Sequence, residues 1–273
     1  MDAADSKLLL GRHTPVVQTY APQLLYAISR ATARQQLGIR QAPPFHGVDL
    51  WHAYEMSWLD DSGKPVVRVG RFAVPADSPN IVESKSFKLY LNSLNSKRFA
   101  GDDEARQVIV ADISATAGRP VTLELFPVDD AALSGARLAG ACLDGEPLAP
   151  WSGEPCAGQL QVQAGRAVEE KVYSHLLRSL CPVTGQPDWA TVWLHYRGLP
   201  VSRGSLLQYI VAYRQHQEFH EQCVERMFCD ITAVCEPEFL HIQAFYTRRG
   251  GLDINPFRST QAGASALPRL DRQ

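Results

Sequence analysis

The order of hydrophobic patterns occurs twice along the chain, and this repeat restricts the possible fold more than any other feature. In the first half, "ESKSFKLYLNSLNSKRF" places four apolar residues on one face of a predicted helix: Phe87, Tyr90, Leu91 and Leu94. In the second half, "SLLQYIVAYRQ" has four such residues, each 119 positions later: Leu206, Tyr209, Ile210 and Tyr213. The strand-like segment "FLHIQAFYT" follows "PVTLELFPV" with the same offset, since Phe245 falls on Phe126. A constant offset across a helix and a strand indicates an internal duplication.

The hydrophobic pattern of each copy predicts two strands, two helices and further strands. In the first copy, "LWHAYEMSWL" and "PVVRVGRFAV" form a predicted hairpin, and one face of its first strand carries Leu50, Tyr54, Met56 and Trp58. We expect Ser84 to cap the helix that follows. The pattern predicts an α+β fold in which tandem units pack helices on one face of antiparallel sheets.

The two copies differ in the motifs that could carry chemistry. We expect an N-terminal unit over residues 1–130 with the motif "ESKS", a linker and opening strand over 131–165, and a C-terminal unit over 166–273. Only the second copy contains "CPVTGQPDW" and "EFHEQC". If one active site is assembled, each copy therefore supplies a different part of it.

Composition limits the class of protein. The chain has 273 residues and a formal net charge of −2, which does not favour a large nucleic-acid interface. It has no apolar run near the roughly 20 residues of a membrane span, and "MDAADSKLLLGRHTP" is too short and acidic for a secretory signal. The six cysteines include no CxxC pair, so we expect reduced thiols and a cytoplasmic protein.

Cys181 and Asp188 lie seven positions apart in the loop "SLCPVTGQPDW". A cysteine thiolate is a strong nucleophile when its surroundings favour ionisation or a neighbour takes the proton, and a carboxyl group at the end of the loop can move protons. The alternative is a half-buried thiol beside a carboxylate that caps a turn. The spacing alone leaves both interpretations open.

The motif "FHEQC" places His220 and Glu221 side by side. On a helix they point about 100° apart, so both reach one pocket only at a helix start. There a histidine can exchange protons with a ligand, and a glutamate can pair with an N–H edge. The alternative is a surface polar pair on a helix that buries Val224, Met227, Phe228 and Ile231.

Two further motifs carry groups suited to a polar ligand. Glu83 in "ESKS" precedes a predicted helix, where a carboxylate is easily held and can read a guanine- or pterin-like edge. Lys85 and Lys88 are suited to phosphate, as are Arg248 and Arg249 in "YTRRGGLDINP". The alternatives are a capped helix with a solvated charged face and an ordinary surface turn.

A zinc site is not predicted. Cys223, Cys229 and Cys235 are six positions apart, a spacing that drifts around a helix, and short CxxC or HxxxH ligand pairs are missing.

Taken together, "ESKSFKLYLNSLN", "CPVTGQPDW", "QEFHEQC" and "YTRRGGLDINP" resemble the NADPH-dependent 7-cyano-7-deazaguanine reductases, the nitrile reductases of the queuosine pathway. The resemblance is to their long, two-copy form and extends from about residue 15 to the end. It implies the tunnelling fold, whose units bind purine- or pterin-like rings. It also implies two NADPH per turnover and no metal.

The resemblance implies a role for each matching residue. Cys181 matches the cysteine that attacks the nitrile carbon to give a covalent thioimide, and Asp188 matches the general acid. His220 is a reasonable proton partner in later steps. The implied substrate-binding residues are Val82, Glu83, Ser84, His220 and Glu221. The implied NADPH-binding residues are Ser84, Lys85, Arg249 and Gly250.

Two other functions stay open at this point. One is a tunnelling-fold hydrolase of the pterin or GTP cyclohydrolase type, which would require zinc ligands. The other is a non-catalytic purine-binding module with an inert Cys181. In each case we expect a small-molecule ligand, no direct contact with nucleic acid or membrane, and a homodimer or larger homo-oligomer, because tunnelling folds expose sheet edges.

Overall fold

The computed structural model describes residues 17, 19–148 and 153–273, and the chain divides into two compact units. Unit 1 comprises Met1–Thr32, Leu50–Leu133 and Arg248–Asp253, and unit 2 comprises Ala33–Asp49, Ser134–Thr247 and Ile254–Gln273. The opening segment, for which we expected no secretory signal, and residues 149–152 of the predicted linker lie outside the described residues. Among the helices that are described, none has the length and apolar character needed to cross a membrane.

Unit 1 pairs a small sheet with two helices. Its strand order is β5–β3–β2, and β3 and β5 are antiparallel, with Val69 opposite Phe126. The strands are β1 (Ala27–Ser29), β2 (His46–Leu59), β3 (Pro65–Pro75), β4 (Asn80–Val82) and β5 (Thr122–Phe126), with β1 paired to β4. Strand β2 begins in unit 2. The helices are α1 (Ala31–Gln36), which continues into unit 2, α2 (Ser84–Ser93) and α3 (Asp102–Ala117), with short 3₁₀ turns at Pro22–Leu24 and Ala131–Leu133.

The core of unit 1 forms where α2 meets the sheet. All four residues of the predicted apolar face of α2 are buried, and Phe87 packs edge-on against Trp51 and Phe72. The predicted alternation along β2 is wrong near Trp51, because Trp51, His52 and Ala53 are buried in succession while Leu50 is only half-buried. Both faces of β2 are covered there, since Trp51 contacts α2 and His52 is hydrogen-bonded to Asp253.

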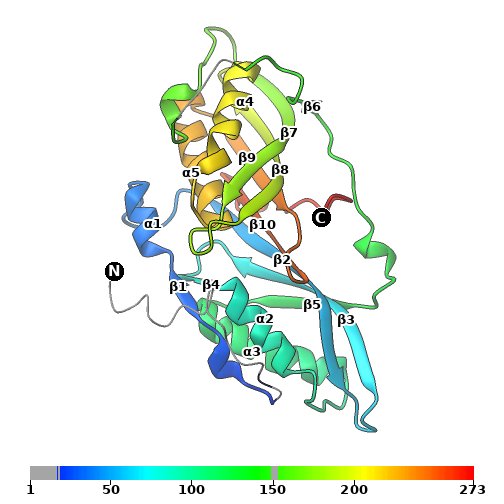
Figure 1. The fold of residues 1–273 in the computed structure, drawn as a ribbon. Helices are drawn as coiled ribbons and strands as arrows, with labels where there is room; N and C mark the ends of the chain where they lie inside the picture. The colour runs from blue at the N-terminus through cyan, green and yellow to red at the C-terminus, as the bar shows by residue number, and fades with distance from the viewer. Residues whose placement is uncertain (1–16, 18, 149–152) are drawn as a thin grey trace. The chain divides into compact units, whose positions relative to one another are not determined.

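Unit 2 has a larger sheet with two helices packed against it. The strand order is β10–β9–β8–β7–β6, antiparallel except for the β6–β7 pair, and α4 and α5 lie along this sheet (Figure 1). The strands are β6 (Ala141–Cys142), β7 (Val168–Leu180), β8 (Pro187–Gly198), β9 (Phe239–Tyr246) and β10 (Leu252–Ser259), of which β10 begins in unit 1. The helices are α4 (Arg203–Ala212) and α5 (His220–Cys235), with 3₁₀ turns at Ala157–Gln159 and Tyr213–Gln215.

The predicted duplication and the α+β fold class are confirmed. Apart from the three-residue β4, which precedes α2, the order strand, strand, helix, helix, strand occurs as β2, β3, α2, α3, β5 and again as β7, β8, α4, α5, β9. Helices α2 and α4 each have 10 residues, and both ends of α4 lie 119 positions after those of α2. The repeated hydrophobic spacing therefore reflects a repeated structural unit.

A buried ionic cluster holds α5 within unit 2. Glu225 on α5 contacts Arg34 and Arg258, and Arg258 also contacts Asp49. Arg258 is fully buried, so its charge depends on these carboxylates. The apolar face of the same helix (Val224, Met227, Phe228 and Ile231) is buried as expected. Helix α5 is thus fixed on two sides, and its first residue, His220, belongs to the candidate site.

Candidate functional site

Cys181 begins the short loop that joins β7 to β8. Its backbone N–H donates to the carbonyl of Gln186 at 2.9 Å, and its carbonyl accepts from the N–H of Gly185 at 2.9 Å. Gly185 has φ +66°, a left-handed conformation that glycine adopts without strain. Cys181 is only 4 % exposed, so the loop holds the thiol in a fixed and largely dehydrated position.

The side chains of Asp188 and His220 contact each other in unit 2. Asp188 lies opposite Ser179 in the β7–β8 register, on the strand that leaves the loop, and is 8 % exposed. The Nε2 atom of His220 lies 3.2 Å from the Oδ2 atom of Asp188. A buried carboxyl group with an imidazole at this distance can pass a proton to or from a ligand.

The ring of His220 is held by stacking. It lies parallel to the ring of Tyr246, with centroids 3.7 Å apart and an interplanar angle of 7°. Its Nδ1 atom is buried and has no hydrogen-bond partner among the residues that the structure describes. The Nε2 atom is thus directed at Asp188.

Tyr246, Cys223 and Glu221, which lie near His220 in sequence or in space, are all buried. Burial raises the pKa of Tyr246 well above its ordinary value, and the nearby Cys223 and Asp188 add to this effect. Burial likewise raises the pKa of Cys223, so this second thiol stays protonated. Glu221, in the first turn of α5, is 2 % exposed and lies where the helix dipole favours a negative charge. Of the thiols in this part of unit 2, Cys181 is therefore the better nucleophile candidate.

In unit 1, Glu83 and not Ser84 is the N-cap of α2. The Glu83 carboxylate accepts from the N–H groups of Lys85 (3.0 Å) and Ser86 (2.6 Å), and its own N–H donates to the carbonyl of Tyr26. The predicted serine cap is wrong because the longer glutamate side chain folds back onto the helix and accepts from its free N–H groups. Glu83 is 1 % exposed and the preceding Val82 is 3 % exposed, so this segment is rigidly placed.

The predicted NADPH-binding residues all belong to unit 1, where the Arg249–Gly250 turn lies beside α2. The Arg249 N–H donates to the carbonyl of Leu252 and closes a turn in which Gly250 has φ +60°. A Cβ atom on Gly250 would lie 3.2 Å from the Nζ atom of Lys88 on α2. This turn and α2 line a cavity of about 240 Å³, whose walls are Glu55, Lys88, Leu91, Asn92, Asn95, Gly250, Gly251 and Leu252. Ser84 and Lys85, both half-buried, begin the same helix.

Asp253, which follows this turn, was part of a quoted motif but had no predicted role. Its carboxylate accepts from the Tyr54 hydroxyl at 2.6 Å and lies 2.8 Å from the His52 Nδ1 atom. The guanidinium of Arg248 lies over the Tyr54 ring at 4.2 Å. The network ties the "RRGG" turn to β2, and only the strand pairing that the fold creates could have revealed it.

The predicted site residues thus fall into two sets, and each set lies within one unit. Unit 2 holds Cys181, Asp188, His220 and Glu221, whereas unit 1 holds Val82, Glu83, Ser84, Lys85, Arg249 and Gly250.

Comparison with known proteins shows which family the chain resembles. A family model described as "Nitrile reductase, 7-cyano-7-deazaguanine-reductase N-term" matches residues 16–125, and one described as "QueF-like protein" matches residues 187–265. The NADPH-dependent 7-cyano-7-deazaguanine reductase of Dechloromonas aromatica (strain RCB) is 53 % identical over 266 residues, which cover 97 % of this chain and 93 % of the relative. Among solved structures, the archaeosine synthase QueF-Like in its apo form is 17 % identical, with a TM-score of 0.31, over 37 % of this chain and 99 % of that chain.

Proposed function

This chain belongs to the NADPH-dependent 7-cyano-7-deazaguanine reductase family, and we propose that it reduces the nitrile of 7-cyano-7-deazaguanine to 7-aminomethyl-7-deazaguanine in queuosine biosynthesis. The observation that carries the proposal beyond the family is the buried Cys181 loop with the Asp188–His220 pair in the same unit. These groups are the ones that a covalent mechanism requires: a nucleophile and a proton donor.

The first step forms a covalent bond to the protein. The Cys181 thiolate attacks the nitrile carbon, a C–S bond forms, and one π bond of the nitrile breaks. The nitrogen receives that electron pair and takes a proton from Asp188, which gives a thioimide on Cys181. General acid catalysis of this kind contributes about 10²–10⁴-fold to the rate. His220 lies 3.2 Å from Asp188 and can return the proton that the carboxyl group has given up.

The reduction then needs two electron pairs. NADPH, when bound, supplies a hydride to the former nitrile carbon in each of two reductions. Loss of the Cys181 thiolate between the two reductions restores the nucleophile and leaves an imine. The balance is one nitrile, two NADPH and two protons to one aminomethyl group and two NADP⁺. Thiolate addition is useful because it converts a poor hydride acceptor into a C=N bond that accepts hydride.

The residues of unit 1 fit the remaining tasks. Glu83, fixed at the N-terminus of α2, can accept from the N–H groups of the deazaguanine edge, with Val82 and Ser84 beside it. The Arg249–Gly250 turn faces Lys88 and presents exposed backbone and positive charge, which suit the phosphates of NADPH. Ser84 and Lys85 begin α2, and Lys88, Leu91 and Asn92 of the same helix line the cavity.

We also propose a homo-oligomer in the cytoplasm. A complete site needs both residue sets, from one chain or from neighbouring chains. The end strands β5 and β6 in the strand orders of units 1 and 2 provide edges to which another copy can add. A reduced catalytic thiol persists in the cytoplasm, where glutathione and thioredoxin keep cysteines reduced.

The experiment is a turnover assay with product identification. We expect two NADPH oxidised per 7-cyano-7-deazaguanine consumed and a product whose mass has increased by four hydrogen atoms. Cys181→Ala should abolish both, whereas Cys156→Ala, which removes an exposed cysteine, should change neither. Full turnover by Cys181→Ala, or no turnover by the unmodified protein, would refute the proposal.

A further inference from the structure

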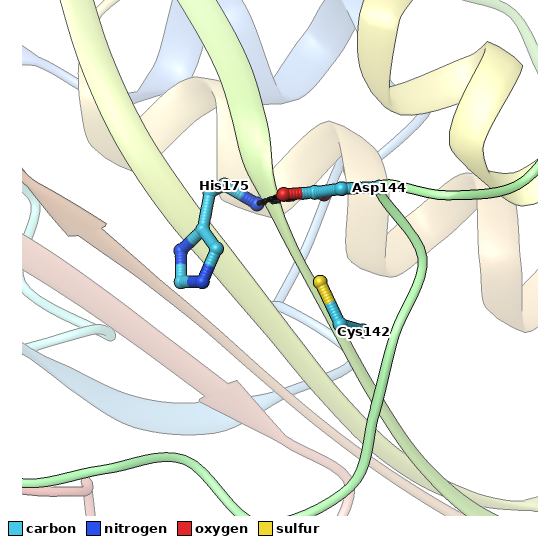
Figure 2. Close-up of side chains that lie close together, drawn as sticks. All are labelled: Cys142, Asp144 and His175. Atoms are coloured by element: carbon cyan, nitrogen blue, oxygen red, sulfur yellow. Dashed lines mark hydrogen bonds between the residues drawn. The ribbon is translucent and has the colours of Figure 1, made fainter.

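Three potential metal ligands that the reductase chemistry does not use lie together in unit 2. Cys142, Asp144 and His175 each offer one ligand atom, and these atoms lie within 4.8 Å of one another (Figure 2). We propose that they form a binding site for a divalent transition-metal ion, with zinc as the best match. The proposed site shares no residue with the predicted catalytic or NADPH-binding sets, so it does not depend on the proposed function.

The backbone brings Cys142 beside β7. Strand β6 has only two residues and pairs in parallel with β7, with Cys142 opposite Tyr173. One residue later, the Leu143 N–H donates to the Tyr173 carbonyl at 2.8 Å and continues the alignment. The chain then turns at Asp144, so that its carboxylate also reaches β7 (Figure 2).

A β-bulge places His175 at this point. The β7–β8 register passes from Ser174 opposite Val192 to Leu177 opposite Ala190, so that His175 and Leu176 face Thr191 alone. A bulge of this kind bends the strand and redirects a side chain, and bulges occur often beside functional sites. His175 lies on the exposed side of β7, and Leu176, the residue that breaks the alternation, is exposed as well.

Asp144 is oriented by the bulge and keeps the capacity to bind a cation. Its Oδ1 atom accepts from the Ser174 hydroxyl at 2.7 Å and from the His175 N–H at 3.1 Å. Among the described residues, its Oδ2 atom has only a longer contact of 3.3 Å with the same N–H. Because each carboxylate oxygen has two lone pairs, these bonds fix the group without saturating it.

The His175 ring is held as metal-binding histidines commonly are. Its Nδ1 atom lies 2.9 Å from the Thr191 hydroxyl, which also accepts from Arg272 at 3.4 Å. A proton on Nδ1 donated to Thr191 leaves the lone pair of Nε2 free for a metal. A hydrogen bond at the second ring nitrogen is the usual outer-shell support of a metal-binding histidine.

The donor set decides which ion is expected. One sulfur, one imidazole nitrogen and one carboxylate oxygen suit tetrahedral Zn²⁺ with water as the fourth ligand, whereas Ca²⁺ and Mg²⁺ prefer oxygen donors. Cys142 and His175 are both exposed, so an ion can enter from solvent. Binding would tie the two-residue β6 to β7 and release the thiol proton of Cys142.

The alternative to a metal site is a purely structural role, in which Asp144 only caps the bulge. Co²⁺ distinguishes the two, because it replaces Zn²⁺ and gives a thiolate charge-transfer band in the near ultraviolet when a cysteine binds it. We expect the metal-free, reduced protein to bind one equivalent of Co²⁺ with this band, and excess Zn²⁺ to displace it. Cys142→Ser should remove the band. Cys156→Ser, which removes the other exposed cysteine, and Cys181→Ala should keep it.

A second variant tests the support of the imidazole. Thr191→Val keeps the size of the side chain but removes the Nδ1 partner, so it should weaken Co²⁺ binding by about 10–100-fold, the usual effect of losing an outer-shell group. An unchanged charge-transfer band in Cys142→Ser, or no band in the unmodified protein, would overturn the proposal. The readout needs neither NADPH nor the nitrile substrate, so its failure is distinct from a failure of the reductase assignment.

Discussion

Replacing Glu225 with glutamine should destabilise unit 2 by about 3–5 kcal/mol, because it leaves a buried positive charge without one of its two partners. The Nη2 atom of Arg258 lies 2.9 Å from Glu225 and 2.8 Å from Asp49, and the Nη2 atom of Arg34 lies 2.8 Å from the same Glu225 oxygen. Two guanidinium groups and two carboxylates thus balance inside the protein. Glutamine keeps the size of the side chain but removes one negative charge.

The position of Arg258 shows why the effect should be large. Its side chain is fully buried, so water cannot replace the lost carboxylate. Burial alone lowers the pKa of Arg258, but the neighbouring Asp49 and Glu225 outweigh this effect and hold the pKa above its ordinary value. The charge of Arg258 is therefore maintained by these carboxylates. Removal of one partner from a buried pair is typically far more harmful than loss of a surface pair.

Thermal or urea unfolding of matched variants measures the effect. For a protein of this size, about 2–4 °C of midpoint is lost per kcal/mol, so Glu225→Gln should lower the midpoint by roughly 6–20 °C. The control is Glu238→Gln, also in unit 2, because Glu238 pairs with Arg197 at 3.1 Å while both side chains are more than half exposed (61 % and 52 %). That control should cost less than about 1 kcal/mol. Equal, small shifts in the two variants would refute the reasoning.

Three further outcomes follow from the site and its surroundings. Asp188→Asn should lower NADPH turnover by about 10²–10⁴-fold, and a loss under tenfold would contradict its role as general acid. Arg249→Ala should raise the KM for NADPH by roughly tenfold or more while the KM for the deazapurine stays constant, because a charged hydrogen bond contributes about 1.5–3 kcal/mol; the reverse pattern would contradict the assignment. Burial lowers the pKa of His216, but the hydrogen bonds that its ring donates to Glu218 and Glu154 outweigh burial and raise the pKa above 6.5. His216 therefore contributes stability below pH 6.5 that is lost as the pH rises through the raised pKa. The His216→Gln variant should have a lower free energy of unfolding than the unmodified protein at pH 6 and nearly the same value at pH 9. An equal loss at both pH values would argue against this role of His216.

The helices could be predicted because their apolar residues follow the helical period. Phe87, Tyr90 and Leu91 on α2 have counterparts on α4, and all are buried as expected. The cap of α2 could not be assigned correctly, because preference alone favours Ser84 whereas the folded chain lets Glu83 reach back to two N–H groups. Local spacing therefore predicts an element more reliably than its first residue.

In the candidate site, too, some features follow from local spacing and others only from the tertiary fold. The spacing of the loop predicts Cys181 and Asp188 as a pair, because a tight hairpin keeps its two ends close together. The contact between Asp188 and His220, and the stacking of His220 on Tyr246, depend on how α5 packs against the sheet. The grouping of His175 with Cys142 and Asp144 depends on a bulge and on a two-residue strand. Neither the contacts of His220 nor the grouping of His175 with Cys142 and Asp144 has a periodic signal in the sequence.

The buried ionic cluster was equally hidden. Arg34, Asp49, Glu225 and Arg258 come from four separate segments, and charged residues are usually exposed, so sequence patterns place them on the surface. Only the tertiary fold makes them partners.

The central claim is that Cys181 forms a covalent bond with the nitrile, and an intact mass measurement tests it most directly. The protein is incubated with 7-cyano-7-deazaguanine in the absence of NADPH, so that the reaction stops at the thioimide. The account predicts a mass increase equal to one substrate molecule per chain in the unmodified protein and in Cys156→Ala, and none in Cys181→Ala. An unmodified protein without the adduct, or a Cys181→Ala variant that still carries it, would contradict the account.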